Sequence, residues 1–193
     1  MSNILVVVPL KSFRTAKQRL RAEGVARADD LMRELADGVI TAVRPRPCLV
    51  VCEDPEVAQW SLRRGTGVWL RNSLDLNDAV TSVREGVRHR VDFVLIVHGD
   101  LPHPEGLAEF EPSKAVTIVP DHHGRGTNVL GLHRDIDFTF EYGEDSALRH
   151  REQAQRRGVS VDWREDTTWS FDIDTLEDLH RTHKEGGLST PLP

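Results

Sequence analysis

Five short apolar segments, rich in β-branched residues, recur along the first part of this chain and are separated by stretches with helical periodicity. They are Ile4–Val8, Cys48–Val51, Gly67–Leu70, Phe93–Val97 and Ala115–Val119. Each is apolar throughout instead of alternating, which is typical of strands buried on both faces. Parallel strands also need crossover connections, usually helices. The pattern therefore predicts an α/β fold of three layers, Rossmann-like, with a mostly parallel sheet and helices on both faces.

The stretches between and after these segments predict the helices and the domain organisation. Helical periodicity covers residues 28–43, 55–64, 76–87, 146–157 and 175–183. Residues 129–132 are expected to form a further strand, antiparallel to its neighbours. A chain of 193 residues with 38% hydrophobic content suits one core, so we expect a single domain over residues 1–183. The last ten residues, 184–193, are rich in Gly, Ser, Thr and Pro and are expected to be disordered.

Charge and hydropathy exclude two classes of partner. The formal net charge is −6, which argues against a broad surface for nucleic acid or anionic membrane. The apolar start, Ile4 to Pro9, is too short for a membrane-spanning helix or a secretory signal, and no basic segment precedes it. The sequence therefore predicts a cytoplasmic protein that binds neither nucleic acid nor membrane.

Carboxylates stand where two segments should reach one edge of the sheet. Asp100 closes the fourth apolar segment in His-Gly-Asp-Leu-Pro, and ligands of open α/β sheets collect beyond the carboxyl ends of the strands. Asp172 and Asp174 flank one apolar residue, so an extended backbone places them on the same face. Together the three could hold one or two hard divalent cations, Mg²⁺ or Mn²⁺. Taken singly, Asp100 is also a turn former and Asp174 a helix cap.

A basic loop follows the first strand and is a candidate for binding phosphates. Residues 9–20 read Pro-Leu-Lys-Ser-Phe-Arg-Thr-Ala-Lys-Gln-Arg-Leu, with cations at Lys11, Arg14, Lys17 and Arg19. Charge-assisted hydrogen bonds from such residues suit a triphosphate. The loop lacks both the P-loop order and the Gly-x-Gly-x-x-Gly pattern. Taken alone, a short basic stretch of this kind is more often a solvated surface.

Two later loops offer donors to a second anion. Residues 120–128 contain two glycines with Arg125, Thr127 and Asn128 as donors. Residues 142–146, Tyr-Gly-Glu-Asp-Ser, precede a helix whose first amides could bind a carboxylate or phosphate. The simpler interpretation is that Ser146 caps the helix and Gly143 forms a turn.

Six motifs in order resemble those of one enzyme family. They are Val8–Lys11 with Ala16–Leu20, Leu76–Ala79, Asp100–Pro102, Gly126–Asn128, Gly143-x-x-Ser146 and Asp172–Thr175. In this order they resemble the 2-phospho-L-lactate or phosphoenolpyruvate guanylyltransferases of deazaflavin coenzyme F(420) biosynthesis. The resemblance spans the chain up to about Leu179 and implies the nucleotidyltransferase fold of molybdenum-cofactor guanylyltransferases.

The resemblance also implies roles for individual residues. Lys11, Lys17 and Arg19, with Pro9, would hold the phosphates of GTP, and Leu76 and Asn77 would lie near the guanine. Asp100 and Asp172, with Asp174, would bind magnesium, and Asp100, Lys17 and Asp172 would carry catalysis. Thr127, Gly143 and Ser146 would receive a small phosphorylated acid. GMP would pass from GTP to that acid with release of pyrophosphate, and no catalytic histidine is needed because the acceptor phosphate is already anionic.

Two acidic residues depart from the family pattern and leave alternatives open. Glu144 and Asp145 stand where small neutral residues are usual, and their charges would repel an anionic acceptor. An acceptor other than the two named acids, CTP in place of GTP, or a nucleotide-binding subunit without activity are therefore the competing hypotheses. The sequence also leaves open whether the protein is a homodimer.

Overall fold

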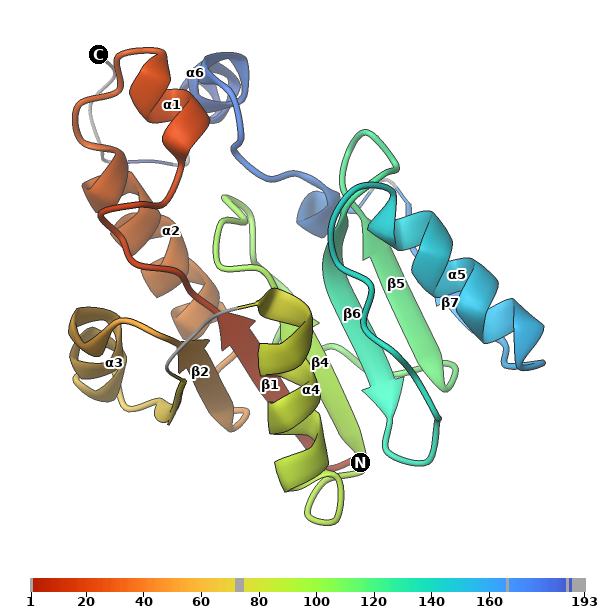
Figure 1. Cartoon of the computed structure of the whole chain (residues 1–193). Coiled ribbons are helices and arrows are strands. Elements are labelled where there is room, and N and C mark those ends of the chain that lie inside the picture. Colours follow the sequence, from red (N-terminus) through yellow and green to blue (C-terminus); the bar gives the residue numbers. More distant parts are fainter. Residues whose placement is uncertain (1, 72–74, 166, 187, 189–193) are drawn as a thin grey trace.

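The computed structural model describes residues 2–71, 75–165, 167–186 and 188, and its elements alternate between strands and helices (Figure 1). The strands are β1 Ile4–Pro9, β2 Cys48–Cys52, β3 Gly67–Leu70, β4 Phe93–Val97, β5 Val116–Pro120, β6 Thr127–His133 and β7 Val161–Trp163. The helices are α1 Gln18–Ala22, α2 Ala28–Ala42, α3 Pro55–Leu62, α4 Leu76–Val87, α5 Ser146–Arg156 and α6 Leu176–Lys184, with a 3-10 turn, η1, at Thr168–Ser170. The α/β prediction is confirmed.

The strands form one mixed sheet in the order β3-β2-β1-β4-β6-β5-β7. Strand β6 runs antiparallel to β4 and to β5, as expected for this segment, and the other pairings are parallel. Gly131 lets β6 lie close to β4, because a Cβ there would stand 2.6 Å from a ring carbon of Phe93. A side chain at this position would therefore push two buried strands apart.

Helices cover both faces of the sheet, which explains why the strands are apolar throughout. In β1, Val6 and Val8 pack on one side against α2 and α3, whereas Val7 packs on the other side against α4. Helix α5 lies on the same side as α4, through Ala147 and Ala154. Both faces are thus removed from water, as the sequence pattern predicts.

The helix starts follow capping chemistry that is visible in the sequence. The Asp75 side chain accepts hydrogen bonds from the backbone N–H groups of Asn77 and Asp78 at the start of α4. Thr175 and Asp178 form a capping box at the start of α6. Asp174 is therefore not the cap of this helix, so that simpler interpretation of Asp174 is wrong.

Three short elements lie outside the sequence prediction, and one predicted segment lies mostly outside the described residues. Helix α1, strand β7 and η1 are too short for periodicity to indicate them. Helix α1 packs beside α6 through Leu20 and Leu179 (Figure 1). Of the expected tail, Lys184 is the last residue of α6, and residues 187 and 189–193 are not described.

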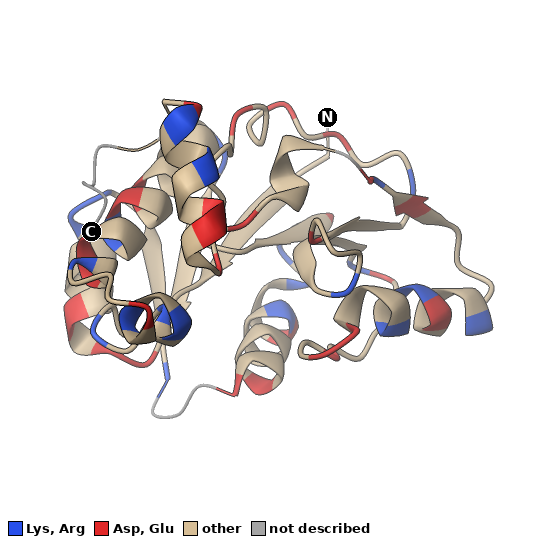
Figure 2. Cartoon of the chain, turned by 90° about the horizontal axis from the view of Figure 1, so that it is seen from above, with Lys and Arg blue, Asp and Glu red and all other residues tan. Residues whose placement is uncertain are grey.

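The helices carry side chains of both charge signs. Figure 2 shows acidic and basic positions mixed along the helices. Among the described residues, no helix is both long and apolar enough to cross a bilayer.

Candidate active site

A cleft of about 780 Å³ opens where β1 and β4 end and β6 begins. Because β1 and β4 are parallel and β6 is antiparallel to β4, these three termini share one edge of the sheet. The strand order also reverses at β1. The chain adds β2 and β3 on one side of β1 and then places β4 on the other side. Ligands of open α/β sheets bind at such a switch point.

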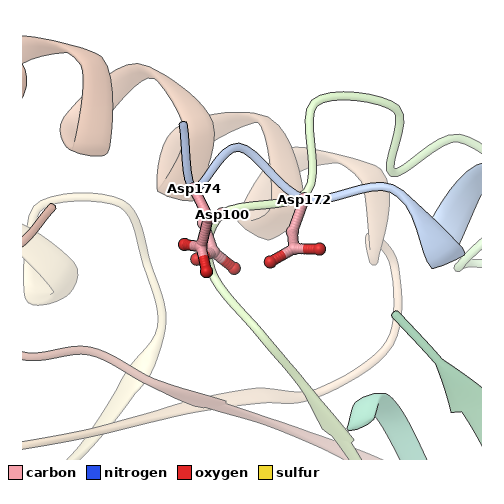
Figure 3. Close-up of side chains that lie close together, drawn as sticks. All are labelled: Asp100, Asp172 and Asp174. Atoms are coloured by element: carbon pink, nitrogen blue, oxygen red, sulfur yellow. The ribbon is translucent and has the colours of Figure 1, made fainter. Parts of the chain in front are cut away.

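Three carboxylates from distant parts of the chain converge at this cleft (Figure 3). Asp100 follows β4, and Asp172 and Asp174 lie on the extended segment between η1 and α6. One carboxylate oxygen from each lies within 4.8 Å of the other two. Alternation along the extended segment brings both of its acids to one side, as the sequence pattern predicts.

Lys17 supplies the positive charge within this cluster. Its Nζ donates to Asp100 Oδ2 at 2.6 Å and to Asp174 Oδ1 at 3.0 Å. The backbone of Lys17 has a left-handed conformation, with φ of 54°, at the N-cap of α1. A non-glycine residue adopts this conformation only where its surroundings impose it, and here it directs a nearly buried ammonium group at the carboxylates.

The electrostatics of the cluster shift the pKa values of Asp100 and Asp172 in opposite directions. Burial would raise the pKa of Asp100, but the adjacent Lys17 holds that pKa below its ordinary value. Burial likewise would lower the pKa of Lys17, but the two carboxylates raise it above its ordinary value. Burial and the charges of Asp100 and Asp174 raise the pKa of Asp172 to about 7. The cluster therefore carries more negative charge than one ammonium group offsets.

This cluster fits a hard divalent cation. The second oxygen of Asp100, Oδ1, is buried and has no hydrogen-bond partner among the described residues. Carboxylate oxygens are the ligands that Mg²⁺ and Mn²⁺ prefer. An ion coordinated by these acids would satisfy the buried oxygen and offset the charge that raises the pKa of Asp172.

Asn128 fixes the segment that carries Asp172. Its side-chain amide lies 3.1 Å from the carbonyl oxygens of both Trp169 and Ser170, and 3.3 Å from Asp172 Oδ1. The amide is buried and faces the protein. Asn128 therefore positions the acidic segment, and its amide hydrogens are directed at protein oxygens instead of at the bound anion that the sequence suggests.

The basic loop after β1 lines the same cleft. Pro9, Lys11, Lys17 and Arg19 all border it. Lys11 is exposed, and Arg19 is an exposed partner of Asp174 at 3.9 Å. Arg14, by contrast, pairs with Glu56 of α3. Three of the four expected cations thus face the cleft.

Of the two residues expected near the nucleotide base, one lines the cleft and the other bonds the backbone of a residue that lines it. Leu76 borders the cleft at the start of α4. Asn77 uses its side-chain oxygen and nitrogen on the backbone of Tyr142, at 2.7 and 3.3 Å. Tyr142 itself lines the cleft, although no role was predicted for it from the sequence.

The three residues expected to receive the acceptor lie together. Thr127, Gly143 and Ser146 all border the cleft, and Thr127 Oγ1 lies 3.0 Å from Ser146 Oγ. Asp145, not Ser146, is the N-cap residue of α5, and its side chain makes no cap hydrogen bond. The interpretation of Ser146 as a simple helix cap is therefore wrong.

Arg125 pairs with the two acids that depart from the family pattern. Its guanidinium donates to Glu144 Oε1 at 2.5 Å and to Asp145 Oδ1 at 2.8 Å. The two acidic charges are thus partly offset from within the protein. The donors of Arg125 are directed at these two side chains instead of at a bound anion, and the pairing reduces the negative charge of Glu144 and Asp145.

The loop from β5 to β6 is held tightly around Asp121, which the sequence did not single out. The Asp121 carboxylate accepts from the backbone N–H groups of His123, Arg125 and Gly126. A Cβ at position 126 would lie 2.6 Å from Asp121 Oδ2, so this approach requires glycine. Nδ1 of His122, in the same loop, lies 3.6 Å from Asp172 Oδ1. His98 also lines the cleft, and burial lowers its pKa.

Comparison with known proteins adds family information to this geometry. A family model described as "Guanylyl transferase CofC like" matches residues 4–187. A phosphoenolpyruvate guanylyltransferase from Sphaerobacter thermophilus is 32% identical over 186 residues, which cover 91% of this chain and 90% of the relative.

Solved structures support the fold independently. A putative nucleotide-diphospho-sugar transferase from Desulfovibrio desulfuricans has a TM-score of 0.77 at 17% identity, over 98% of this chain and 90% of its own. Rv0371c from Mycobacterium tuberculosis, in a complex with manganese, has a TM-score of 0.58 at 15% identity, over 95% of this chain and 98% of Rv0371c. At such identities the likeness concerns the fold, and it agrees with the nucleotidyltransferase fold expected from the sequence.

Proposed function

Because the chain belongs to the family of CofC-like guanylyl transferases, we propose that this guanylyltransferase transfers GMP from GTP to phosphoenolpyruvate in coenzyme F(420) biosynthesis. The observation that carries the proposal is the convergence of Asp100, Asp172 and Asp174 with Lys17 in a cleft that also holds the Thr127 and Ser146 hydroxyls. The names of the relatives favour phosphoenolpyruvate over 2-phospho-L-lactate as the acceptor.

The basic loop is the proposed site for the triphosphate. Lys11 and Arg19 are exposed at the rim of the cleft and can each add charge-assisted hydrogen bonds to phosphate oxygens. Lys17 lies deeper, beside the acidic cluster, where its ammonium group can orient the phosphate that reacts. Leu76 offers an apolar contact to the base, while Asn77 acts through the loop that it holds.

The acidic cluster is the proposed metal site. A divalent cation held by Asp100, Asp172 and Asp174, Mg²⁺ or alternatively Mn²⁺, supplies positive charge that lets two anions approach and that stabilises the leaving pyrophosphate. The unpartnered oxygen of Asp100 supports this assignment, and so does the manganese complex of a protein with the same fold.

The acceptor end needs donors and no strong base. Thr127, Ser146 and the backbone around Gly143 can hold the carboxylate and phosphate of the three-carbon acid. An oxygen of its phosphate then attacks the α-phosphorus of GTP, a new P–O bond forms, and the bond from the α-phosphorus to the bridging oxygen breaks. Pyrophosphate leaves with that electron pair. The acceptor oxygen is already anionic, so no side chain has to remove a proton.

The test is the identity of the product. The purified protein is incubated with Mg²⁺, each of the four common nucleoside triphosphates, and phosphoenolpyruvate or 2-phospho-L-lactate, and pyrophosphate and the guanylylated acid are measured. We expect fastest release with GTP and phosphoenolpyruvate, and retained activity in the surface control Asp37→Asn. Preferential reaction with CTP or with another acceptor would overturn the assignment of substrates, and GTP binding without any release would favour an inactive subunit.

A further inference from the structure

A buried hydrogen-bonded chain runs behind the acceptor end of the cleft, and its interpretation rests on the proposed function. His150 Nδ1 lies 3.2 Å from Thr127 Oγ1, which in turn lies 3.0 Å from Ser146 Oγ. Thr127 and Ser146 border the cleft, whereas His150 is fully buried on α5 behind them. No role for His150 was predicted from the sequence.

The backbone determines which nitrogen of His150 carries the proton. The N–H of Glu141 donates to His150 Nε2 at 3.0 Å. Because a backbone N–H can only donate, Nε2 must be the unprotonated nitrogen. A neutral ring then carries its proton on Nδ1. An imidazolium is excluded because its Nε2 would also carry a hydrogen, which would face the hydrogen of the Glu141 N–H. His150 Nδ1 is therefore a donor to Thr127.

This assignment bears on the two hydroxyl groups in front of the ring. Thr127 Oγ1 accepts from His150, so its own hydrogen is available for Ser146 Oγ. Within the described part of the chain, Ser146 Oγ has Thr127 as its hydrogen-bond partner. A hydrogen bond donated by Thr127 to Ser146 Oγ leaves the O–H of Ser146 to point into the cleft. This arrangement gives the chain one direction, from the buried ring to the substrate.

Packing keeps the ring in this orientation. The ring of Tyr142 meets His150 edge to face at 5.1 Å, and Phe138 lies at 5.4 Å. Aromatic side chains from the segment before α5 therefore enclose the ring, so it has little freedom to flip.

We infer that His150 is a positioning residue of the acceptor site, which orients Thr127 and Ser146 so that Ser146 presents a hydrogen to an anionic oxygen of the acceptor. A hydroxyl can present either a hydrogen or a lone pair, and only the hydrogen attracts a carboxylate or phosphate. A fixed donor therefore selects for an acidic acceptor without adding a positive charge to the pocket.

The kinetic test compares two substitutions of His150 in two backgrounds. His150→Leu removes the donor, and His150→Asn keeps a donor near the position of Nδ1. We expect His150→Leu to raise KM for phosphoenolpyruvate about tenfold with KM for GTP unchanged, and His150→Asn to restore most of the loss. In a Ser146→Ala background, His150→Leu should raise KM for phosphoenolpyruvate by less than about twofold, because the hydroxyl that His150 orients is absent. Equal effects in both backgrounds, or an equal rise in KM for GTP, would overturn the inference.

A second measurement needs neither turnover nor a variant that folds as stably as the wild type. Nitrogen-15 NMR of the histidine rings reports the tautomer of His150, assigned by the signal lost in His150→Asn. We expect a neutral ring with its proton on Nδ1 at neutral pH. A proton on Nε2, or a charged ring, would refute the chain. Because this spectrum is recorded without substrate, it stands even if phosphoenolpyruvate proves to be the wrong acceptor.

Discussion

Replacing Lys17 with methionine removes the positive charge of the acidic cluster and little else. The side chain of Lys17 is only 6% exposed, and its Nζ lies 2.6 Å from Asp100 and 3.0 Å from Asp174. Methionine has a similar length and the same left-handed backbone cost, because it also carries a Cβ. The substitution therefore leaves two neighbouring carboxylates without their counter-charge.

The size of the effect follows from the exposure of the two partners. Breaking a buried ion pair by removing one partner costs about 3–5 kcal/mol. Asp100 is 20% exposed and Asp174 is 51% exposed, so solvation of the two unpaired carboxylates offsets part of that cost. The pair with Asp174 contributes at most about 1 kcal/mol. We expect Lys17→Met to lower the free energy of unfolding by about 2–4 kcal/mol in metal-free buffer.

Urea denaturation in the presence of a chelator measures this difference. Lys11→Met is the matched control, because Lys11 is an exposed lysine of the same loop and should change stability by no more than about 0.5 kcal/mol. Added Mg²⁺ should then stabilise Lys17→Met more than the wild type, since the cation replaces the missing charge. Equal stability of Lys17→Met and the wild type without metal, or an equal gain from Mg²⁺, would refute the reasoning.

Three further substitutions have defined outcomes. Arg125→Gln leaves Glu144 and Asp145 unpaired and should raise KM for phosphoenolpyruvate severalfold at low salt but less at high salt. Steady-state kinetics at two ionic strengths measure this difference, and an equal rise in KM at both would contradict the prediction. Burial lowers the pKa of His150 from 6.5 to about 3, so the unfolded chain binds more protons between these values. The contribution of His150 to the free energy of unfolding should therefore fall by about 2 kcal/mol as pH falls from about 8 to about 5. Urea denaturation should show this fall as the difference between the pH profiles of the wild type and His150→Asn, and parallel profiles would refute it. Asn128→Ala should lower the free energy of unfolding by about 1–3 kcal/mol, and unchanged denaturation would rule out its positioning role.

The strands and the longer helices could be predicted because their signals are local. The segments Gly67–Leu70 and Phe93–Val97 are β3 and β4 to the residue, since polar or turn residues bound each apolar run. Helix α4 also matches, because Asp75 caps its first turn. Helix α1 has only five residues, too few for a periodic pattern.

The acidic residues of the site could be predicted, but their electrostatic partners could not. Period two along an extended chain places Asp172 and Asp174 on one face, and the end of a buried strand places Asp100 at the cleft. The ion pair of Lys17 with Asp100, however, joins residues 83 positions apart. Likewise, the charges of Glu144 and Asp145 suggest repulsion when read alone, and only the fold brings Arg125 to them.

Two asparagines that were expected at the substrates make their side-chain hydrogen bonds within the protein. Asn77 holds the backbone of Tyr142, and Asn128 holds the segment before Asp172. Their polar side chains resemble ligand donors in the sequence. Their hydrogen bonds to the backbone depend on contacts between segments more than forty residues apart, which no local pattern reports.

The central claim is that Asp100, Asp172 and Asp174 together hold the divalent cation on which guanylyl transfer depends. The most direct test is the rate of pyrophosphate release as a function of Mn²⁺ concentration, at saturating GTP and acceptor, in the wild type and in Asp172→Asn. We expect the variant to need at least about tenfold more Mn²⁺ for half-maximal rate and to turn over at least about a hundredfold more slowly. The same Mn²⁺ dependence and the same maximal rate in both proteins would contradict the claim.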